Sequence, residues 1–158
     1  MDQIDNSRKW TDSRFLIVPG QPVGKGRPRF ARRGAFIKTY TPAKTKAYEH
    51  RVAVFWSGPK IASGTPVRVE VVAIFKRPKR LFRKRDPDEL VDCLAKPDGD
   101  NVLKSVLDAL NGVAYEDDNQ VVECSVRKCY HEKTVRGTYE GKPRTLVRVS
   151  VPTEWGAL

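Results

Sequence analysis

The strongest constraint on the fold is the alternation of side chains along residues 66–76. A period of two residues predicts a β-strand, because successive side chains of a strand point to opposite faces of the sheet. The segment also becomes more apolar towards its carboxyl end. The apolar set that occupies every second position is Val67, Val69, Val71 and Ala73.

A helical period appears at Asn101–Gly112. Apolar residues recur there at i, i+3, i+4 and i+7, which predicts an amphipathic helix. Gly112 provides the carboxyl-terminal stop. The apolar stripe consists of Leu103, Val106, Leu107 and Leu110.

Weaker patterns place the remaining elements. A second helix is expected over about Pro42–Trp56, with Thr41 as its N-cap, Pro42 as its first residue and early turns that face solvent. Residues 86–96 are interpreted as a loop or a short helical piece. Strands are expected at Arg14–Pro19, Gln120–Tyr130 and Thr145–Val151, and the basic loop Gly20–Gly34 leads into a hairpin whose second strand is Ala35–Tyr40.

Length and composition favour one soluble domain. The chain has 158 residues, 39% hydrophobic and 31% charged, which suits a single globular domain. No apolar run approaches the roughly 20 residues of a membrane helix, and no secretory signal is visible. We expect a flexible tail over residues 1–13 and, over 14–158, a cytoplasmic α+β domain with a mostly antiparallel sheet and two main helices.

Charge is segregated along the chain. The whole sequence has 30 basic and 19 acidic residues, a net charge of +11. Residues 86–123 hold eleven acidic and two basic residues, a net of −9, which leaves +20 on the rest. The basic excess predicts an anionic partner, most often nucleic acid. The acidic segment would repel phosphates unless a cation lay between them.

The acidic segment contains a candidate catalytic constellation. Asp98 and Asp100 flank the helix start, and Asp100, Lys104 and Asp108 are spaced to share one face, which we place opposite the leucine stripe. Mg²⁺ prefers carboxylate oxygens and keeps other positions for water and phosphate. The cation lowers the pKa of a water, and a lysine offsets developing charge. These residues predict metal-assisted phosphodiester hydrolysis.

A structural interpretation of the same aspartates stays open. Asp98 and Asp100 are also suited to cap a helix and complement its dipole, and Asp117 and Asp118 are suited to a turn. The helix is about 16 Å long, so Asp118 reaches its start only if residues 112–117, about 20 Å when extended, double back. Otherwise the carboxylates meet across a dimer interface.

The two-part aspartate pattern resembles a known signature. The RusA family of Holliday junction resolvases has such a pattern, and the Gly24–Arg29 loop, Tyr48-Glu49 and Lys128 resemble its phage-type branch. Gly99 departs from the family, in which an apolar residue is usual at that position. The resemblance covers about residues 18–128, and its core is Asp98-Gly99-Asp100-Asn101-x-x-Lys104-x-x-x-Asp108 followed by Asp117-Asp118-x-Gln120.

The resemblance implies a small homodimeric α+β endonuclease, often of prophage origin. Such enzymes nick four-way DNA junctions in pairs with Mg²⁺, for which Mn²⁺ can substitute. It implies that Asp98, Asp100 and Asp118 are catalytic metal ligands and that Lys104 is the catalytic lysine. Asp117 and Asp108 are candidates for supporting roles beside the metal. The alternatives are a non-catalytic nucleic-acid-binding module and a nuclease of the same chemistry acting on flaps or forks.

Basic residues are expected to bind the DNA backbone, although a solvated basic face is the alternative. Phosphate contacts fix position rather than sequence, which suits an enzyme that reads branched shape. Phe30 and Phe82 lie within runs of basic residues. We favour packing of their rings against the protein over stacking on unpaired bases. The candidate DNA contacts are Lys25, Arg27, Arg29, Arg32, Arg33, Lys76, Arg77, Lys79, Arg80, Lys96 and Lys128.

The three cysteines predict neither a disulfide framework nor a zinc site. An odd number favours free thiols. Cys124 and Cys129 would face opposite sides of one strand, and we interpret Cys124 as a small buried apolar residue.

Overall fold

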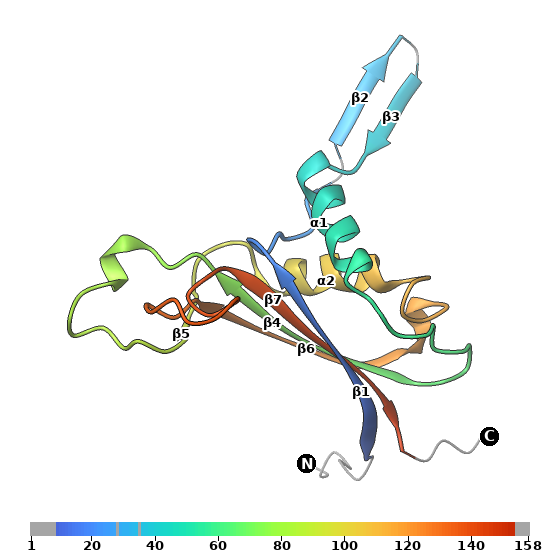
Figure 1. The fold of residues 1–158 in the computed structure, drawn as a ribbon. Helices are drawn as coiled ribbons and strands as arrows, with labels where there is room; N and C mark the ends of the chain where they lie inside the picture. The colour runs from blue at the N-terminus through green and yellow to red at the C-terminus, as the bar shows by residue number, and fades with distance from the viewer. Residues whose placement is uncertain (1–8, 28, 35, 154–158) are drawn as a thin grey trace, which may run out of the picture.

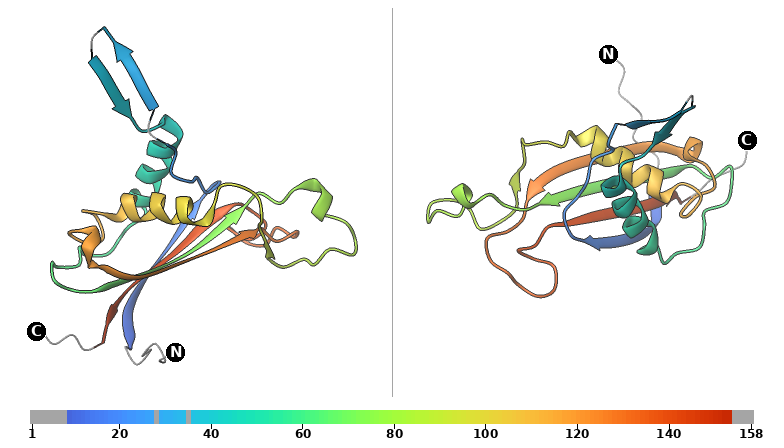
Figure 2. Two further views of the ribbon diagram at one scale, coloured as in Figure 1. Left: turned by 180° about the vertical axis from the view of Figure 1, so that it is seen from behind. Right: turned by 90° about the horizontal axis from the view of Figure 1, so that it is seen from above.

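Two helices lie on one face of a five-stranded sheet, and a two-stranded hairpin projects from the start of the first helix (Figures 1 and 2). The computed structural model describes residues 9–27, 29–34 and 36–153, with the backbone alone at positions 12, 13, 29, 31, 33, 37 and 38. In chain order the elements are β1 (Trp10–Pro19), β2 (Arg29–Arg33), β3 (Phe36–Tyr40), α1 (Ala43–Val54), β4 (Val67–Phe75), η1 (Lys79–Leu81), β5 (Val91–Asp92), α2 (Gly99–Leu110), η2 (Asp118–Gln120), β6 (Val121–Tyr130) and β7 (Arg144–Pro152).

The sheet is mostly antiparallel, and the α+β prediction is confirmed. Its strand order is β1-β7-β4-β6-β5. Every neighbouring pair is antiparallel except β4 and β6, which are parallel. Parallel strands need a long crossover connection, and the segment that contains α2 supplies it. The crossover therefore places α2, with its acidic residues, over the sheet.

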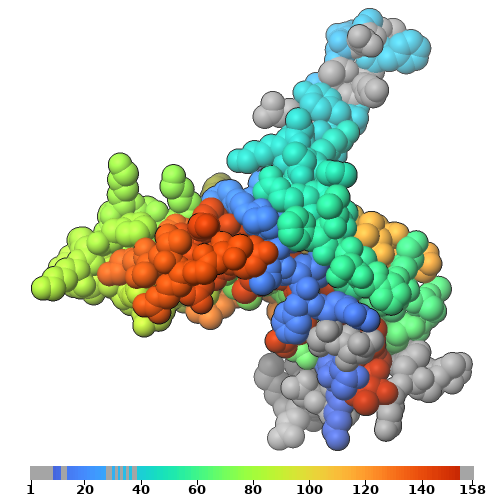
Figure 3. Space-filling model, viewed as in Figure 1, coloured from blue at the N-terminus to red at the C-terminus, as the bar shows by residue number. Residues whose placement is uncertain are grey.

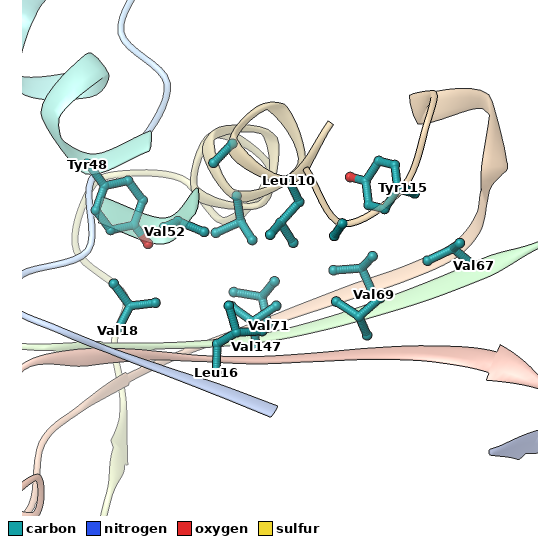
Figure 4. Close-up of a cluster of buried hydrophobic side chains, with 14 residues drawn as sticks. Leu16, Val18, Tyr48, Val52, Val67, Val69, Val71, Leu110, Tyr115 and Val147 are labelled. Atoms are coloured by element: carbon teal, nitrogen blue, oxygen red, sulfur yellow. The ribbon is translucent and has the colours of Figure 1, made fainter. Parts of the chain in front are cut away.

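The alternation of β4 is confirmed, and it builds the core. Val67, Val69 and Val71 are buried and point towards the helices, where they meet Leu16 and Leu110 (Figure 4). The last three residues of the strand, Ala73, Ile74 and Phe75, are all buried, so both faces of the sheet are covered there.

Helix α1 packs differently from the prediction. It begins at Ala43, and Pro42 is itself the N-cap residue, with its carbonyl accepting hydrogen bonds from the Thr45 and Lys46 amides. Thr45 and Tyr48 of the early turns are buried, so the prediction that these turns face solvent is wrong. The Tyr48 ring packs beneath the helix because its hydroxyl reaches the Thr145 hydroxyl at 2.7 Å.

Strand β1 begins earlier than the apolar pattern suggested. It begins at Trp10 rather than Arg14, and Trp10 pairs with Pro152 of β7. Backbone pairing with β7 extends the strand through a polar stretch that has no apolar signal of its own. Of the tail predicted over residues 1–13, residues 1–8 lie outside the described ranges.

Strand β6 has an open edge within the described part of the chain. Its neighbour β5 pairs only with Cys129 and Tyr130, so residues 121–127 have β4 on one side and no strand on the other. Neither α1 nor α2 combines the length and apolar character needed to cross a bilayer, and the same holds for the rest of the described residues.

Candidate active site

An open pocket of about 310 Å³ lies between α2, η2 and the start of β6. It combines carboxylates, one lysine and an apolar wall. Three of its charged residues come from one helix, and the fourth comes from the turn that follows that helix. The lining residues are Asp100, Leu103, Lys104, Leu107, Asp108, Asp118, Val121 and Cys124.

Helix α2 presents Asp100, Lys104 and Asp108 on one face, and Leu103 and Leu107 share it. The prediction that the charged residues lie opposite the leucine stripe is therefore wrong. The reason is geometric, since positions i, i+3, i+4, i+7 and i+8 all fall on the same side of a helix. The most buried face of α2 is instead formed by Val102, Val106, Ala109 and Leu110.

Asp98 occupies the N-cap position of α2, but its side chain makes no capping hydrogen bond. Its carbonyl accepts the hydrogen bond of the Val102 amide, while the side chain is exposed. The interpretation that this carboxylate serves to cap the helix is not supported. Asp98 lies beside the pocket rather than among its lining residues.

The chain doubles back after α2 and brings Asp118 into the pocket. Gly112 adopts a φ of 72°, a left-handed conformation that glycine tolerates at a helix end, which confirms it as the stop. Its amide donates to the Tyr115 carbonyl at 2.9 Å. Burial raises the pKa of Tyr115, and the charges of Asp118 and Asp108 raise it further. One chain is thus sufficient to place Asp118 near Asp100 and Asp108.

Gln120 anchors the turn that carries Asp118. Its side-chain oxygen accepts hydrogen bonds from the amides of Glu116 and Asp117 at 2.9 and 3.1 Å. Its side-chain nitrogen donates to the carbonyls of Ala62 and Thr65 at 2.8 and 3.0 Å. The motif contains Gln120, but the sequence carries no signal of partners more than fifty positions earlier. This positioning role is therefore visible only in the structure.

Asp117 has a structural contact of its own. Its carboxylate accepts a hydrogen bond from the Asn119 amide at 2.9 Å and closes a capping box with Gln120 around η2. Asp117 therefore supports the turn, as one of the sequence interpretations proposed, while its neighbour Asp118 faces the pocket.

The predicted metal ligands differ from most acidic side chains of the segment because they make no hydrogen bond or ion pair with the described residues. Seven of the eleven acidic side chains in residues 86–123 make a hydrogen bond or ion pair. Within the described ranges, the other four have no such protein partner. A carboxylate that is not paired with a basic side chain is available to bind a metal cation. These four are Glu89, Asp98, Asp100 and Asp118.

The donor set fits a hard divalent cation that is completed by substrate. No three Asp, Glu, His or Cys side chains of the described residues come close enough together to hold a metal ion by themselves. Mg²⁺ usually takes one or two carboxylates and fills its other positions with water and phosphate oxygens. Asp100 and Asp118 suit that kind of site, with Asp98 at its margin.

Lys25 is held beside the pocket by both helices. Its ammonium is paired with Glu49 of α1 at 2.6 Å and with Asp108 of α2 at 2.5 Å, and its amide donates to the Asn101 carbonyl at 2.8 Å. Partial burial lowers the pKa of Lys25, but the two carboxylates outweigh it and hold that pKa above its ordinary value. The sequence predicts that Lys25 binds DNA from the basic loop Gly20–Gly34. The structure instead places its ammonium between α1 and α2, where both helices bind it.

The structure corrects the prediction made for Arg77, one of the basic residues of the run that follows β4. It is 3% exposed, and its guanidinium donates to the carbonyls of Leu81, Pro87, Glu89 and His131. The prediction that Arg77 binds DNA is wrong, because it is used to hold the loop after β4. Sequence reasoning grouped it with its neighbours by charge alone.

Lys128 is likewise engaged by the protein. Its ammonium donates to the carbonyls of Ala95 and Pro97 at 2.6 and 2.7 Å. It thereby secures the loop that leads into Asp98, which is a different role from the predicted contact with DNA.

Other predicted DNA contacts remain exposed. The side chains of Arg29 and Arg33 lie outside the described residues. Phe30 is exposed rather than packed, against the sequence interpretation, whereas Phe82 packs against Arg77 and His131 as that interpretation favoured. Cys124 is exposed in the pocket wall, so its predicted burial is wrong. The exposed basic side chains are Arg27, Arg32, Lys76, Lys79, Arg80 and Lys96.

A larger hollow of about 420 Å³ lies elsewhere, lined in part by Asp88, Glu132 and Arg136. Two of its carboxylates are already occupied, since Asp88 accepts hydrogen bonds from Thr134 and Glu132 is paired with Arg144. The smaller pocket over α2 is the better candidate for chemistry, because it brings Asp100 and Asp118 together with Lys104.

Sequence comparisons relate the chain to known proteins. Residues 19–150 match the model of the endodeoxyribonuclease RusA family. The uncharacterized protein YqaN of Bacillus subtilis (strain 168) is 37% identical over 125 residues, which cover 75% of this chain and 88% of YqaN. The family match spans the pocket and every strand of the main sheet in whole or in part. The chain therefore belongs to the RusA family of endodeoxyribonucleases.

Proposed function

We propose that this protein is a Mg²⁺-dependent endonuclease that resolves four-way DNA junctions by paired nicks. One observation carries the proposal. The pocket brings Asp100, Asp118 and Lys104 together, and both carboxylates have no protein partner among the described residues. A non-catalytic binding module would have no use for unpaired carboxylates on a surface meant to approach phosphates.

The residues of the pocket have different roles in the proposed reaction. Asp100 and Asp118, with Asp98 beside them, would hold the cation. When bound, Mg²⁺, or Mn²⁺ in its place, lowers the pKa of a water and polarises the phosphoryl oxygen. Lys104 lies one helical turn from Asp100 and neutralises charge that develops on the phosphate. Asp108 is paired with Lys25, so we assign it a supporting role.

Two sites are needed to nick two strands, and we expect a homodimer to supply them. An unpaired strand edge is a ready template for a second chain. The open edge of β6 begins at Val121 and includes Cys124, which also line the pocket. A dimer formed along this edge would bring two pockets near one junction. We expect it to act in the cytoplasm, where prophage and host DNA are found.

Asp100→Asn tests the proposal. We expect the variant to lose Mg²⁺-dependent nicking of a synthetic four-way junction by at least about a hundredfold, because a neutral amide is a poor ligand for a hard cation. Binding to the same junction without metal should be unchanged or tighter, because one negative charge near the phosphates is removed. Cleavage is measured on gels and binding by fluorescence anisotropy.

Glu89→Gln is the matched control. Glu89 is another unpaired acid of the same segment, but it lies outside the pocket, so its variant should cut at the wild-type rate. Linear duplex, flap and fork substrates of the same sequence report which branched shape is preferred. An Asp100→Asn variant that cuts as fast as the wild type would contradict the proposed site.

A further inference from the structure

The β2–β3 hairpin, residues 29–40 and hereafter the arm, stands apart from the body of the protein. Its strands pair only with each other, from Arg29 opposite Tyr40 to Arg33 opposite Phe36. Figure 3 shows the arm projecting from the start of α1, clear of the main surface. A two-stranded hairpin has little stability of its own in water, so a binding role is the natural reason for an extended arm.

The arm exposes two large aromatic side chains. Phe30 is 73% exposed and Phe36 is 81% exposed, and neither belongs to a hydrophobic core cluster. Phe30 lies opposite Thr39, whereas Phe36 lies opposite Arg33, so the alternation of a strand places them on opposite faces of the ribbon. Each face therefore offers one aromatic surface to a partner.

Charge identifies the partner as a nucleic acid. The arm contains four basic residues and no acidic one, and Arg27 lies just before it. A second copy of this chain, with a net charge of +11, would meet this arm with an excess of like charge. DNA supplies both the phosphates for the basic side chains and the base faces for the phenylalanines.

The root of the arm is fixed next to the catalytic pocket. Lys25 is paired with Glu49 and Asp108 on the two helices. The glycines on either side of it are closely packed, because a Cβ at Gly24 would lie 2.7 Å from Pro97 and one at Gly26 would lie 2.9 Å from Pro42. The arm therefore leaves the body at a defined point beside Asp108, which also lines the pocket.

We propose that the arm recognises the branch point of the DNA, with Phe30 and Phe36 stacking on bases that are unpaired there. This inference rests on the proposed function. Arg27 and Arg32 would bind the neighbouring phosphates. An intact duplex keeps its base faces stacked inside, so the phenylalanines gain nothing on it and the arm favours branched DNA.

The test compares the double variant Phe30→Ala/Phe36→Ala with the wild type, without metal, on a four-way junction and on a linear duplex. Base–aromatic stacking contributes about fivefold or more in affinity per base, so junction affinity should fall by about 25-fold or more. Duplex affinity should not change. Phe30→Trp/Phe36→Trp should keep the preference for the junction, and Val54→Ala, an exposed apolar residue at the other end of α1, should bind as the wild type does.

A fluorescent base analogue at the branch point provides a second readout. Its emission should be quenched by the wild type and by the Trp variant but not by the Ala variant. Equal weakening on both DNAs, or no weakening, would overturn the role of the arm. A change in molecular mass of the Ala variant by light scattering would also overturn it, because the arm would then be a protein interface. Failure of the wild type to prefer the junction would instead overturn the proposed function.

Discussion

Gln120 uses both ends of its side-chain amide to hold the turn that carries Asp118. It is almost fully buried; two of its hydrogen bonds hold amides of the turn itself, and the other two join the turn to the loop at Ala62 and Thr65. The exposed carboxylate of Asp118 has no such anchor of its own. Its position is therefore set by a buried neighbour two residues away that does not line the pocket.

Replacing Gln120 by Met should reduce both stability and cutting. Several backbone groups would lose their partner in a buried place, at about 1–3 kcal/mol each, so we expect the free energy of unfolding to fall by at least about 2 kcal/mol. Asp118 would be held less firmly, so a higher Mg²⁺ concentration should be needed for half-maximal nicking. Urea unfolding and a Mg²⁺ titration of single-turnover cleavage measure the two effects.

Asn119→Ala is the control for this position, since the Asn119 side chain is exposed and makes no hydrogen bond in the described structure. Its stability and Mg²⁺ requirement should match those of the wild type. A Gln120→Met protein that unfolds earlier but keeps the wild-type Mg²⁺ requirement would show that Gln120 does not position Asp118.

Buried arginines hold the loops at the carboxyl end of β4 and the start of β7. Arg77 secures the loop after β4 through four backbone carbonyls. Arg144 at the start of β7 binds the Glu132 carboxylate through two nitrogens, at 2.7 and 3.0 Å. It also donates to the carbonyls of Tyr139 and Lys142. Each guanidinium group thus ties several backbone carbonyls of its loop together.

The Glu132–Arg144 pair should make stability depend on pH in acid. The hydrogen bonds from Arg144 lower the pKa of Glu132 to about 2, from an ordinary value of 4.5. A depressed pKa stabilises the fold above the unfolded-state value and loses that contribution as pH falls from about 4.5 towards 2. The upper limit is about 3 kcal/mol. Urea unfolding of the wild type between pH 6 and pH 2.5 measures the loss.

Glu132→Gln should be less stable than the wild type at pH 6, and the difference should shrink as pH falls through this window. Glu116→Gln is the control, because its exposed pair with Lys60 should contribute little. A constant difference between wild type and Glu132→Gln across the whole pH range would contradict the assignment.

At the scale of the whole molecule, opposite charges serve different tasks. The β4–α2–β6 crossover places α2 over the sheet, where Asp100 and Asp118 line one pocket and Asp98 lies beside it. The exposed basic residues that we predict to contact DNA lie at Arg27, on the arm, on the loop after β4 and at Lys96. Binding and cutting are therefore carried by different surfaces, and we expect variants to separate them.

Salt dependence should reveal which cations contact DNA. The six predicted DNA contacts whose side chains are exposed would give a slope of log affinity against log salt of about −5 if all contact duplex arms, at about 0.9 for each contact. Arg80→Ala should reduce the slope by about 0.9. Lys128→Met should leave the slope unchanged, because its ammonium is bound to Ala95 and Pro97, and should slow cutting by loosening the loop before Asp98.

Fluorescence anisotropy at four or more salt concentrations gives these slopes. A flat salt profile would contradict the assignment of the basic surface to DNA. A Lys128→Met variant that lowers the slope and keeps the wild-type cutting rate would restore the sequence-based prediction of a DNA contact.

The sequence by itself determined the family and the main secondary structure. The alternation of β4, the helical period of α2 and the stop at Gly112 each depend on neighbours a few positions away, and all three agree with the structure. The aspartate motif is also local, and it identified the residues that the structure places in and beside the pocket.

Only the tertiary structure decided which side chains are available for function. The burial of Arg77, the pairing of Lys25 with two helices and the anchoring of Gln120 depend on partners distant in sequence. The return of Asp118 to α2 depends on how the chain turns after the helix. Charge and spacing describe what a side chain can do, but the packing of distant segments determines what it meets.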